Sequence, residues 1–341
     1  AAALSDANKG LIHQNTTFSS NSTWPYDWSI YVSYEGPVWY VSTSGSDDND
    51  GSEDDPFATI QQGINASSDD DTVLVSPGTY KENVNIEDRS VTLASLFFTT
   101  GDIAYVSSTI IDAESNGSGV AISGSGKNNQ KSSIISGFTI EDAAYSNNNE
   151  GSTYGSGVHI ENYNSVTIDR CIIQENSGSG GGGVNASYNV SLLKITNTVI
   201  KSNDGNGNIG AGIAVGDFPN SIDRFEMYNS LVYGNNNVNE GGGLFINSDV
   251  AIIVNSTIAK NESSGNGSGI VFNSSSNDST LILNSIISDN QSSNIFGGGE
   301  NADIYQNSNN PIVLRNSYLN YALSDLAIDA NNFISTNSPF V

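Results

Sequence analysis

A short phrase recurs along the second half of the chain: an aliphatic residue, Asn, a small residue, further aliphatic residues and a second Asn. The first Asn of successive copies is separated by 32, 26 and 29 residues (229−197, 255−229 and 284−255). A fixed phrase at such a period marks a repeat architecture, in which each unit buries its apolar face by stacking on its neighbours. The eight asparagines are Asn197, Asn229, Asn255 and Asn284 in the leading place and Asn203, Asn235, Asn261 and Asn290 in the trailing place.

A second marker, Gly followed by an aliphatic residue, keeps step with the first, at separations of 26, 29, 31 and 26 residues (183−157, 212−183, 243−212 and 269−243). Around both markers, short apolar runs alternate with turns rich in Gly and Asn, which matches a parallel β-helix whose coils climb by one strand spacing of ~4.8 Å. We therefore predict an all-β solenoid in which Asn side chains stand at turns and hydrogen-bond from coil to coil. The unequal steps place insertions at one turn of each coil, where function often collects. The glycines of this marker are Gly157, Gly183, Gly212, Gly243 and Gly269.

The first part of the chain is built differently. Residues 1–37 show no repeat and hold a cluster of aromatic residues, which we interpret as an arm that packs along the repeat body or covers its end, a platform for glycans being the alternative. Residues 38–341 are predicted to be one domain, opened by a strand at 38–42 and a capping helix at 56–66 that starts at Pro56. Such a helix covers the edge groups at the open end of a stack. The aromatic residues of the arm are Trp24, Tyr26, Trp28, Tyr31 and Tyr34.

The chain of 341 residues carries a formal charge of −26, with only 11 Lys and Arg. So few cations exclude a nucleic-acid partner, since phosphate contacts need Lys and Arg, and they argue against a passive binder of polyanions. The charge fits a soluble extracellular protein whose carboxylates are screened or bound to calcium, although solubility alone is an equal explanation. Cys171 is the single cysteine, so no intrachain disulfide forms, and no apolar run approaches the roughly 20 residues of a membrane span. We expect an extracellular or cell-surface protein whose signal peptide was removed before Ala1.

A more specific pattern runs through residues 40–52 (YVSTSGSDDNDGS), 56–64 (PFATIQQGI) and 71–84 (DTVLVSPGTYKENV). It resembles the N-terminal signature of right-handed parallel β-helix proteins of the pectin-lyase-like superfamily, in particular those with a DUF1565-type opening. The resemblance implies a right-handed helix with an N-terminal α-helical cap, and export, mostly in bacteria and archaea. Members of the superfamily include polysaccharide lyases and hydrolases and many proteins with no known activity.

The motifs of the superfamily's enzymes are missing, so we predict no catalytic residues. Polygalacturonase-like members carry paired Asp motifs and a Gly-His-Gly, whereas this chain has only His13 and His159, and we expect His159 to face a turn or solvent. Lyases of the group use a Lys or Arg base near calcium-binding Asp residues, and no such cluster is visible. We interpret Asp169-Arg170 and Asp223-Arg224 as surface ion pairs, worth little energetically. The basic residues of the middle coils are Lys127, Lys131, Arg170, Lys194, Lys201, Arg224 and Lys260.

An acidic turn is the best candidate for an ion site. Ca²⁺ takes six to eight oxygen ligands, and closely spaced Asp, Asn and Gly residues supply carboxylate and carbonyl oxygens. The spacing is not that of an EF-hand, and a solvated turn is the alternative. We interpret Asp69-Asp70-Asp71 as a charged turn, and the Gly-rich tract 178–183 as a turn because no helix or Lys follows to make a phosphate loop. The candidate calcium ligands, with no other cofactor expected, are Asp47, Asp48, Asn49, Asp50, Glu53, Asp54 and Asp55.

Two further features concern sugars. Asn-x-Ser/Thr sequons are frequent, as chance predicts in such a composition, and they would carry glycans in an exported archaeal or eukaryotic protein. Aromatic residues on the elastic turns either stack on sugar rings or pack along the helix surface; they are Tyr145, Tyr154, Tyr163, Tyr188 and Phe218. The sequons considered are those of Asn15, Asn21, Asn65, Asn116, Asn189, Asn266 and Asn277.

Three functions stay open at this point. We favour an exported, non-catalytic surface protein that acts as a scaffold, an adhesin or a glycan binder. A lyase or hydrolase of acidic polysaccharide is the second, although a chain of charge −26 has few positive groups to hold such a substrate. The third is a subunit that stacks end to end into an extracellular filament. The basis is residues 339–341, which are apolar and followed by no polar cap. We therefore expect either more chain or another subunit at this end. The expected partners are polysaccharides, other surface proteins or further copies of the chain.

Overall fold

The computed structural model describes residues 36–144, 146–148, 151–153, 155–207, 209–216, 221–236, 238–273, 280–292, 303–306, 312–319, 327–328 and 333–334. At 146–153, 327–328 and 333–334 only the backbone of the strands is considered. Residues 1–35 of the predicted arm and the C-terminal residues 339–341 lie outside this part.

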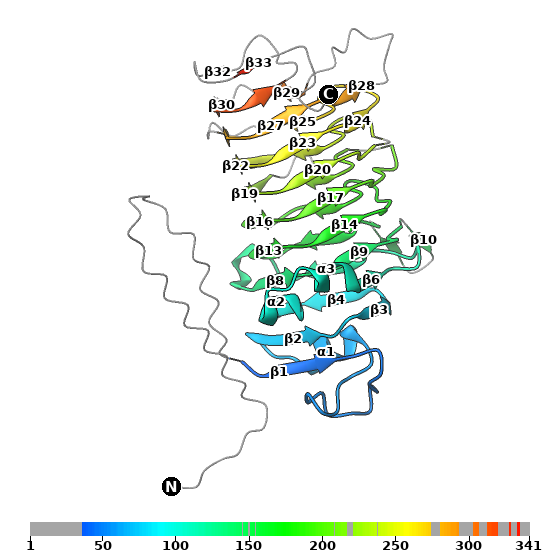
Figure 1. Cartoon of the computed structure of the whole chain (residues 1–341). Coiled ribbons are helices and arrows are strands. Elements are labelled where there is room, and N and C mark those ends of the chain that lie inside the picture. Colours follow the sequence, from blue (N-terminus) through cyan, green and yellow to red (C-terminus); the bar gives the residue numbers. More distant parts are fainter. Residues whose placement is uncertain are drawn as a thin grey trace.

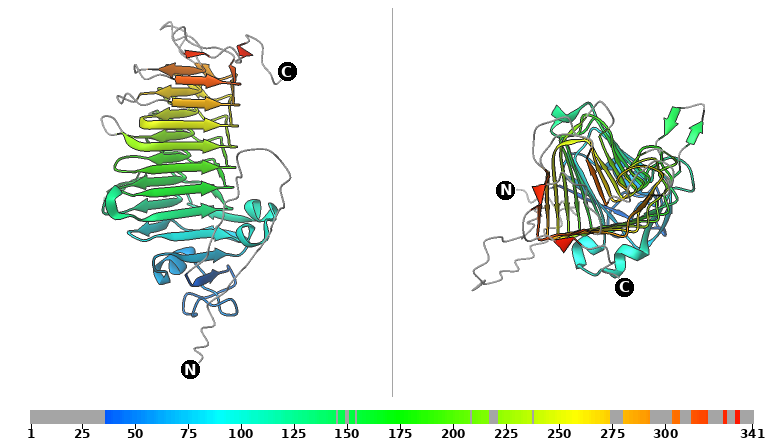
Figure 2. Two further views of the ribbon diagram at one scale, coloured as in Figure 1. Left: turned by 90° about the vertical axis from the view of Figure 1, so that its left-hand side faces the viewer. Right: turned by 90° about the horizontal axis from the view of Figure 1, so that it is seen from above.

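Three long parallel sheets form a right-handed parallel β-helix, as predicted (Figure 1). Each coil runs through sheet A, then sheet B, then sheet C, and the chain then climbs to the next strand of sheet A. Seen along the axis, the coils lie one above another (Figure 2). The pairing is in register from coil to coil, so that residues at the same place in successive coils form columns.

The strands are short and follow the apolar runs of the sequence. Sheet A consists of β1 (Val38–Val41), β2 (Asp71–Val75), β5 (Val91–Ser95), β8 (Ser132–Ser136), β13 (Ser165–Asp169), β16 (Leu192–Thr196), β19 (Ile222–Tyr228), β22 (Ser248–Val254), β26 (Thr280–Leu283), β30 (Ile312–Arg315) and β32 (Ala327–Ile328). Sheet B consists of β3 (Gly78–Lys81), β6 (Thr109–Asp112), β9 (Thr139–Glu141), β14 (Ile172–Gln174), β17 (Val199–Lys201), β20 (Leu231–Tyr233), β23 (Thr257–Ala259), β27 (Ile286–Ser288), β31 (Tyr318–Leu319) and β33 (Phe333–Ile334). Sheet C consists of β4 (Val84–Glu87), β7 (Val120–Ser123), β12 (Val158–Glu161), β15 (Val184–Ala186), β18 (Ile213–Val215), β21 (Leu244–Ile246), β25 (Ile270–Phe272) and β29 (Ile304–Gln306).

The remaining elements are small additions to the coils. Two pairs of short strands lie outside the three sheets, the antiparallel β10 (Ser146–Asn148) with β11 (Gly151–Thr153) and the parallel β24 (Glu262–Ser263) with β28 (Gln291–Ser292). None of the helices in the described part of the chain is long and apolar enough to span a membrane. They are α1 (Ile60–Ala66), α2 (Phe97–Thr100), α3 (Ala104–Ser108) and a 3₁₀ turn at Lys127–Asn129.

Alternate residues of each strand point inward and form one continuous core. In β13, Ile168 is fully buried, whereas Thr167 beside it is partly exposed on the outer face. Stacking repeats this pattern, so that Ile168 lies between Ile135 of one coil and Ile195 of the next. Burying such a side chain contributes ~1.5–3 kcal/mol. The coils are therefore held by their neighbours, as the repeat period predicts.

Five asparagines form a hydrogen-bonded column inside the helix, which we call the inner ladder. The Nδ2 of each of the first four donates to Oδ1 of the asparagine one coil further on, at 2.9–3.0 Å, and the Nδ2 of Asn290 donates at 2.8 Å to Oδ1 of Asp303, which lies 13 residues further in the same coil. All five also donate to a strand carbonyl of the coil before. Each Oδ1 in the middle of the column accepts both a side-chain and a backbone N–H from the rung before. Four hydrogen bonds satisfy an Asn amide completely, as its burial requires. The rungs are Asn176, Asn203, Asn235, Asn261 and Asn290, and the last donates to Asp303.

The Gly marker keeps step with the inner ladder because the two columns touch. At Gly183, Gly212 and Gly243, an added Cβ would lie 2.5 Å from the carbonyl oxygen of the next glycine of the column and 2.9–3.0 Å from an inner-ladder Nδ2. A side chain at these positions would push the coils apart at the ladder. Both sequence markers therefore arise from the same constraint, the close packing of the glycine column against the inner ladder.

A second column of asparagines, the outer ladder, stands on the surface at the turn from sheet A to sheet B. Its members have left-handed φ angles of 49–51°, which Asn tolerates better than most residues. Their side chains bond from coil to coil at 3.2–3.4 Å. A buried column of hydroxyls runs beside it, each accepting a backbone N–H of the coil before. The outer ladder is Asn197, Asn229, Asn255 and Asn284, and the hydroxyl column is Ser230, Ser256, Ser285 and Ser317.

The predicted start of the capping helix is wrong. The helix begins at Ile60 rather than at Pro56, because Thr59 is the N-cap and accepts a backbone N–H of the first turn. Glu82 accepts the N–H groups of Ile60 and Gln61 at 2.8 and 2.9 Å. Burial raises the pKa of Glu82, and these two hydrogen bonds oppose that rise.

Gln61 shows how this helix closes a sheet edge. Its Oε1 accepts the backbone N–H of Asn85 at 2.7 Å, and its Nε2 donates to the carbonyl of the same residue at 3.2 Å. β4 is the edge strand of sheet C at the N-terminal end of the stack. The Gln61 amide therefore makes the backbone hydrogen bonds that a neighbouring strand would make there. An edge satisfied in this way does not recruit another chain.

The inner ladder yields the first testable prediction. Replacing Asn235 by Ala removes four hydrogen bonds and leaves the backbone N–H and one side-chain N–H of Asn203 buried without an acceptor, so we expect a loss of about 3–5 kcal/mol. Asn229→Gly in the outer ladder keeps the left-handed backbone and loses only exposed bonds, so we expect a loss below about 1 kcal/mol. Urea denaturation of both variants measures the difference, and equal midpoints would show that the inner ladder is not a main source of stability.

Candidate functional site

The outer face of sheet A gathers most of the cations of the chain. Of the 11 Lys and Arg, seven lie on this face or at the turns that border it. They are distant in sequence, and the register of the sheet brings them together, since Lys194 lies beside Glu226 and Leu192 lies beside Arg224. The seven are Arg89, Lys127, Lys131, Arg170, Lys194, Arg224 and Arg315.

Four side chains on β16 and β19 form the centre of this face, and we call them the Tyr228 cluster: Lys194, Arg224, Glu226 and Tyr228. The ammonium of Lys194 lies 5.6 Å from the centroid of the Tyr228 ring, within the range of a cation–π contact. The Tyr228 hydroxyl donates to Oε2 of Glu226 at 3.2 Å. Nε of Arg224 forms an ion pair with Oε1 of the same carboxylate. No ion pair of Lys194 is found among the described residues, so its charge is directed at the ring.

The surroundings keep Tyr228 neutral. Burial raises its pKa to about 12, and the Glu226 carboxylate adds to the rise. At neutral pH such a phenol donates a hydrogen bond and does not act as a base. The cluster therefore presents two cationic donors, one carboxylate acceptor and an aromatic ring, which suits holding a polar ligand better than abstracting a proton from it.

Asp169 extends this face by one coil. It is the register partner of Thr196. Its Oδ1 accepts the Thr196 hydroxyl at 2.6 Å and the Asn197 amide at 2.9 Å. Its Oδ2 pairs with Arg170 at 2.6 Å, so the ion pair expected for Asp169-Arg170 is present.

The second expected ion pair, Asp223-Arg224, is wrong. Successive side chains of a strand point in different directions, and these two find separate partners. Asp223 pairs with Lys127 at 2.7 Å, while Arg224 pairs with Glu226. Lys127 and Asp223 are 96 residues apart, a contact that local spacing cannot reveal.

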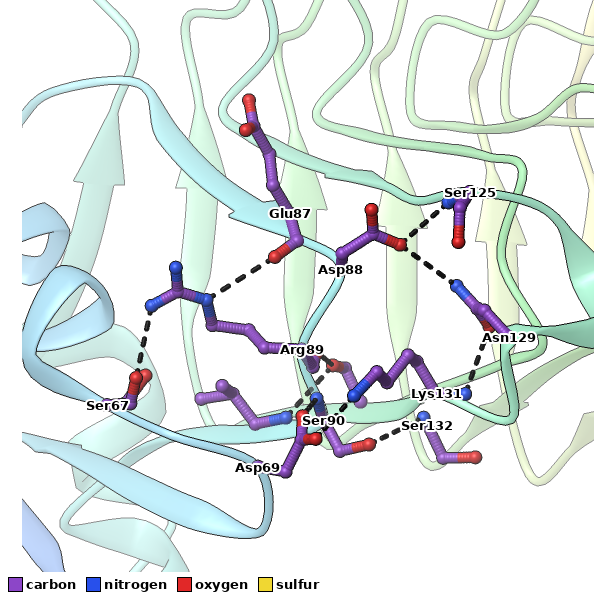
Figure 3. A network of polar contacts seen from close by, with 12 residues as sticks. Ser67, Asp69, Glu87, Asp88, Arg89, Ser90, Ser125, Asn129, Lys131 and Ser132 are labelled. Carbon is purple, nitrogen blue, oxygen red and sulfur yellow. Dashed lines mark hydrogen bonds and ion pairs between the residues drawn. The ribbon is translucent and has the colours of Figure 1, made fainter.

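A polar network borders the same face at the turn from sheet C to sheet A (Figure 3). Asp69 forms an ion pair with Lys131 and accepts the backbone N–H of Ser90 at 2.8 Å. Asp88 accepts the backbone N–H of Ser125 at 2.7 Å. Figure 3 shows these side chains reaching across neighbouring turns. The network fixes the corner at which the strands of sheet A begin.

The acidic turn predicted to bind calcium covers the edge of β1 instead of standing free. Tyr40 exchanges backbone hydrogen bonds with Gly51 and Phe57, each at 2.9 Å. The Asp47 carboxylate accepts two backbone N–H groups just before α1, both at 2.9 Å. Asn49 donates to a carbonyl of the same turn at 2.9 Å. The turn is thus fastened by its own polar groups.

The other predicted ligands in this turn are not gathered around one point. Within the described residues, no group of three or more His, Cys, Asp or Glu side chains is placed to hold a metal ion. Asp50 accepts the backbone N–H of Ser52 at 2.9 Å, and hydrogen bonds from the Ser52 side chain and backbone lower the pKa of Asp50. Calcium binding stays a prediction for Asp47, Asp48, Asn49, Asp50, Glu53, Asp54 and Asp55, and the turn fastened by its own polar groups favours the alternative, a solvated turn without structural calcium.

His159 does not face a turn or solvent, contrary to expectation. It points from the outer face of sheet C and is only 6% exposed. Its Nε2 lies 3.6 Å from Oε2 of Glu161, and the closeness of the imidazole lowers the pKa of Glu161. Its register partner Asn185 is covered by the Gly-rich tract, where an added Cβ at Gly181 would lie 3.0 Å from Cβ of Asn185. A pair this well covered is closed to a polymeric ligand.

Tyr163 is not a platform for sugars. Its ring is fully buried, and its hydroxyl bonds to Ser133 at 2.9 Å and to the carbonyl of Arg89. Burial raises its pKa to about 12. Tyr188 is partly exposed. The other three predicted platforms, Tyr145, Tyr154 and Phe218, lie outside the described side chains.

The sequons differ in exposure. Asn65, Asn116 and Asn189 are exposed, and Asn266 is partly exposed. The exposed amide of Asn189 donates to Asn162 at 3.0 Å. Asn15, Asn21 and Asn277 lie outside the described residues.

A half-open hollow of about 400 Å³ lies between the elastic turns that follow sheet B. Its lining is mainly polar, and its one carboxylate is Glu262. It has no cation or aromatic ring, so it offers less to a ligand than the Tyr228 cluster. The lining residues are Gly207, Asn236, Val238, Asn239, Glu262, Ser263 and Ser264.

The coiled parallel sheets define a right-handed parallel β-helix protein. Residues 43–321 match the family model described as "Protein of unknown function (DUF1565)", and the chain belongs to this family. No curated protein gives a significant match.

Several solved structures align with the chain at low sequence identity. The GH136 lacto-N-biosidase from Eubacterium ramulus aligns with a TM-score of 0.51 and 12% identity over 87% of this chain and 68% of the other. A pectin methylesterase from carrot gives a TM-score of 0.46 and 15% identity over 90% and 86%. The pectate lyase Pel9A gives 0.42 and 13% over 88% and 80%. At 12% identity the likeness to the lacto-N-biosidase shows the fold alone.

The Asp69–Lys131 pair predicts an acid dependence of stability. The hydrogen bond from Lys131 lowers the pKa of Asp69, so its contribution is present above the unfolded pKa near 4 and is lost as the pH falls through the lower folded value. The pair is partly exposed, so the contribution is below about 1 kcal/mol. Asp69→Asn should lower the melting temperature at pH 7 and flatten its fall below pH 4. Asp54→Asn, an equal change of charge in the acidic turn, is the control; the same profile for both variants would contradict the prediction.

The acidic turn predicts the outcome of metal removal. Because its backbone is fastened by Asp47 and Asn49, we expect a chelator to leave the melting temperature of the protein unchanged. Calcium that binds only the folded state would raise the melting temperature in proportion to its occupancy. A clear drop with chelator, absent in Asp50→Asn, would instead show a structural calcium ion in this turn.

Proposed function

We propose that this protein is an exported, non-catalytic β-helix that binds a neutral, hydroxyl-rich glycan along the outer face of sheet A. The Tyr228 cluster carries the proposal. Its ring offers an apolar plane to the C–H face of a sugar, Lys194 and Arg224 donate to hydroxyls, and Glu226 accepts from them. Mutual contacts order these side chains before a ligand arrives, which reduces the entropy lost on binding.

The overall charge favours a neutral ligand over an acidic one. A chain of charge −26 repels polyanions at long range. On the face itself, Arg170 and Arg224 are already paired with carboxylates. Carboxylates such as Asp169 and Glu226 accept hydrogen bonds from sugar hydroxyls but repel uronates.

The shape of the sheet favours an extended ligand. Equivalent side chains of neighbouring strands follow one another every ~4.8 Å along the stack. Asp169, Thr196 and Tyr228 form one such row across three coils. A polymer lying along the row would contact several coils at once, as expected of a surface scaffold or an adhesin.

The same residues argue against a lyase activity. Elimination from a uronate needs a base that is free to take a proton at the working pH. Tyr228, with its pKa raised to about 12, stays protonated, and Glu226 is tied to Arg224 and Tyr228. We therefore assign the cluster to binding.

A matched pair of variants tests this proposal. Tyr233 of sheet B also lies under a lysine, with Lys260 at 5.8 Å from its ring, so Tyr233→Ala removes the same kind of contact from another face. Binding to a panel of neutral oligosaccharides is measured by calorimetry. We expect Tyr228→Ala to weaken binding about tenfold, equivalent to about 1.4 kcal/mol, and Tyr233→Ala to leave it unchanged.

Three results would contradict the proposal. Equal effects of the two variants would place the ligand elsewhere, and no binding to any neutral glycan would remove the glycan function. Unsaturated products from pectate or alginate, detected by their ultraviolet absorbance, would show the protein to be a lyase.

A further inference from the structure

The outer face of sheet A changes from polar to apolar between β19 and β22. Each of the three Tyr228-cluster residues that belong to β19 has an aliphatic register partner in β22. The polar part of the face therefore ends along one line between two neighbouring strands. The three pairs are Arg224 with Val250, Glu226 with Ile252, and Tyr228 with Val254.

The apolar part continues through the next two strands, and we call it the aliphatic stripe. The register places Leu281 beside Ile252, and Val313 beside Leu281. In the second row Leu283 follows Val254, and the exposed Arg315 ends the row. The stripe consists of the partly exposed residues Val250, Ile252, Val254, Leu281, Leu283 and Val313.

The sequence of these strands is typical of a sheet face that is covered. Val250–Val254 is a continuous apolar run, as found in strands with packing partners on both sides. In β13 of the same sheet, by contrast, the outward residues Ser165, Thr167 and Asp169 are polar. A group of neighbouring aliphatic side chains on an outer face marks an interaction surface.

The stripe is too small for a protein partner. It extends ~10 Å along the stack from β22 to β30, which is two strand spacings, and ~13 Å along β22 from Val250 to Val254. A stable protein interface buries about 800 Å² on each partner, several times this area. The dimensions therefore fit an aliphatic chain better than a second copy of the protein.

The chain segments that lead into the stripe supply no cover for it. Residues 274–279, directly before β26, are SSSNDS, and residues 307–311, directly before β30, are NSNNP. Neither segment contains an aliphatic or aromatic residue. Residues 293–302 are more apolar, but they join β28 to β29 of sheet C, so both of their ends belong to another side of the coil.

We propose that the outer face of sheet A binds a neutral glycolipid, with its sugar on the Tyr228 cluster and its aliphatic chain on the aliphatic stripe. This inference rests on the proposed function, because it extends the glycan site into the apolar region that adjoins it. A ligand with a hydroxyl-rich part and an apolar part matches the division of the face between β19 and β22. A neutral ligand is also not repelled by a chain of charge −26.

The two regions are close enough for one ligand. Tyr228 and Val254 are register partners on neighbouring strands, ~4.8 Å apart along the stack. A sugar on the Tyr228 ring would bring its attached chain directly onto Val254 and then Leu283. Each CH₂ group that contacts the stripe on one side should tighten binding about twofold, which corresponds to half of the free energy of its full burial.

Alkyl maltosides of increasing chain length test the proposal on the full chain. They share one neutral head group, so the ratio between the affinities for decyl and hexyl maltoside reports the aliphatic chain alone. Calorimetry below the concentrations at which micelles form measures both affinities. We expect decyl maltoside to bind the parent protein at least about tenfold more tightly than hexyl maltoside.

The variant Ile252→Thr/Leu281→Thr removes apolar surface from the centre of the stripe. Thr is β-branched and suits a strand, and Thr167 already stands in the same row of sheet A. Melting curves show whether the variant is folded. We expect the affinity ratio to fall to about threefold or less, because the chain loses its apolar contacts.

The control is Leu231→Thr on the outer face of sheet B. Leu231 is a partly exposed aliphatic residue whose register partner in the next coil is Thr257, so the same kind of substitution is made away from the stripe. It should leave the affinity ratio unchanged.

Three outcomes overturn the proposal. A ratio near one in the parent protein would show that no aliphatic chain uses the stripe, as when the apolar residues of 293–302 or 320–341 cover it. An unchanged ratio in the stripe variant would place the aliphatic chain elsewhere. A dimer by light scattering that the stripe variant converts to a monomer would make a second copy the occupant.

Failure of this inference and failure of the proposed function give different results. Tyr228→Ala should weaken the binding of hexyl and decyl maltoside by the same factor and leave their ratio unchanged. If Tyr228→Ala has no effect while the ratio still depends on the stripe, the glycan site is wrong and the aliphatic site stands. If Tyr228→Ala weakens binding and the ratio is near one, the aliphatic site alone is refuted.

Discussion

Everything in this molecule depends on the buried amides that join one coil to the next. Each inner-ladder Asn uses all of its hydrogen-bonding capacity, and the glycine beside it leaves no room for a side chain. These two columns fix the vertical register of the coils. Because sheet A inherits that register, residues about 30 positions apart in sequence, such as Lys194 and Glu226, meet on one surface.

The sequence predicted the features that recur in every coil and missed those that depend on a single contact. The Asn phrase and the Gly marker predicted the fold because each recurs in every coil and reports a constraint that every coil shares. The helix start at Ile60 depends on the distant Glu82, and the burial of Tyr163 depends on Ser133, so neither could be read locally. Tyr228 was overlooked because it belongs to a strand and not to an elastic turn. The step of 32 residues between these coils was visible in the sequence, but it aligns Lys194 with Glu226, and the contact of Lys194 with the Tyr228 ring lies two residues off that register.

The properties of the outer face of sheet A can be compared with those of an enzyme. An enzyme needs a group whose pKa lies near the working pH, whereas Tyr228 is held well above it. The polar groups around it are paired with one another and form a fixed surface of donors and acceptors. Membership of the DUF1565 family is compatible with such a surface, since one scaffold carries many activities.

The column of amides also has a direction. Every rung donates toward the C-terminal end, so the aligned amide dipoles place their positive pole there, and the carboxylate of Asp303 receives the last N–H. The Asp303 carboxylate has no N–H to donate, so the series of hydrogen bonds ends there. An acidic residue at the start of an α-helix complements the helix dipole in the same way. Coils can therefore be gained or lost in the interior of the column during evolution without disturbing its polarity. Asp303 is different, because it follows Gly269 in the glycine column and reaches the amide column with its side chain from there.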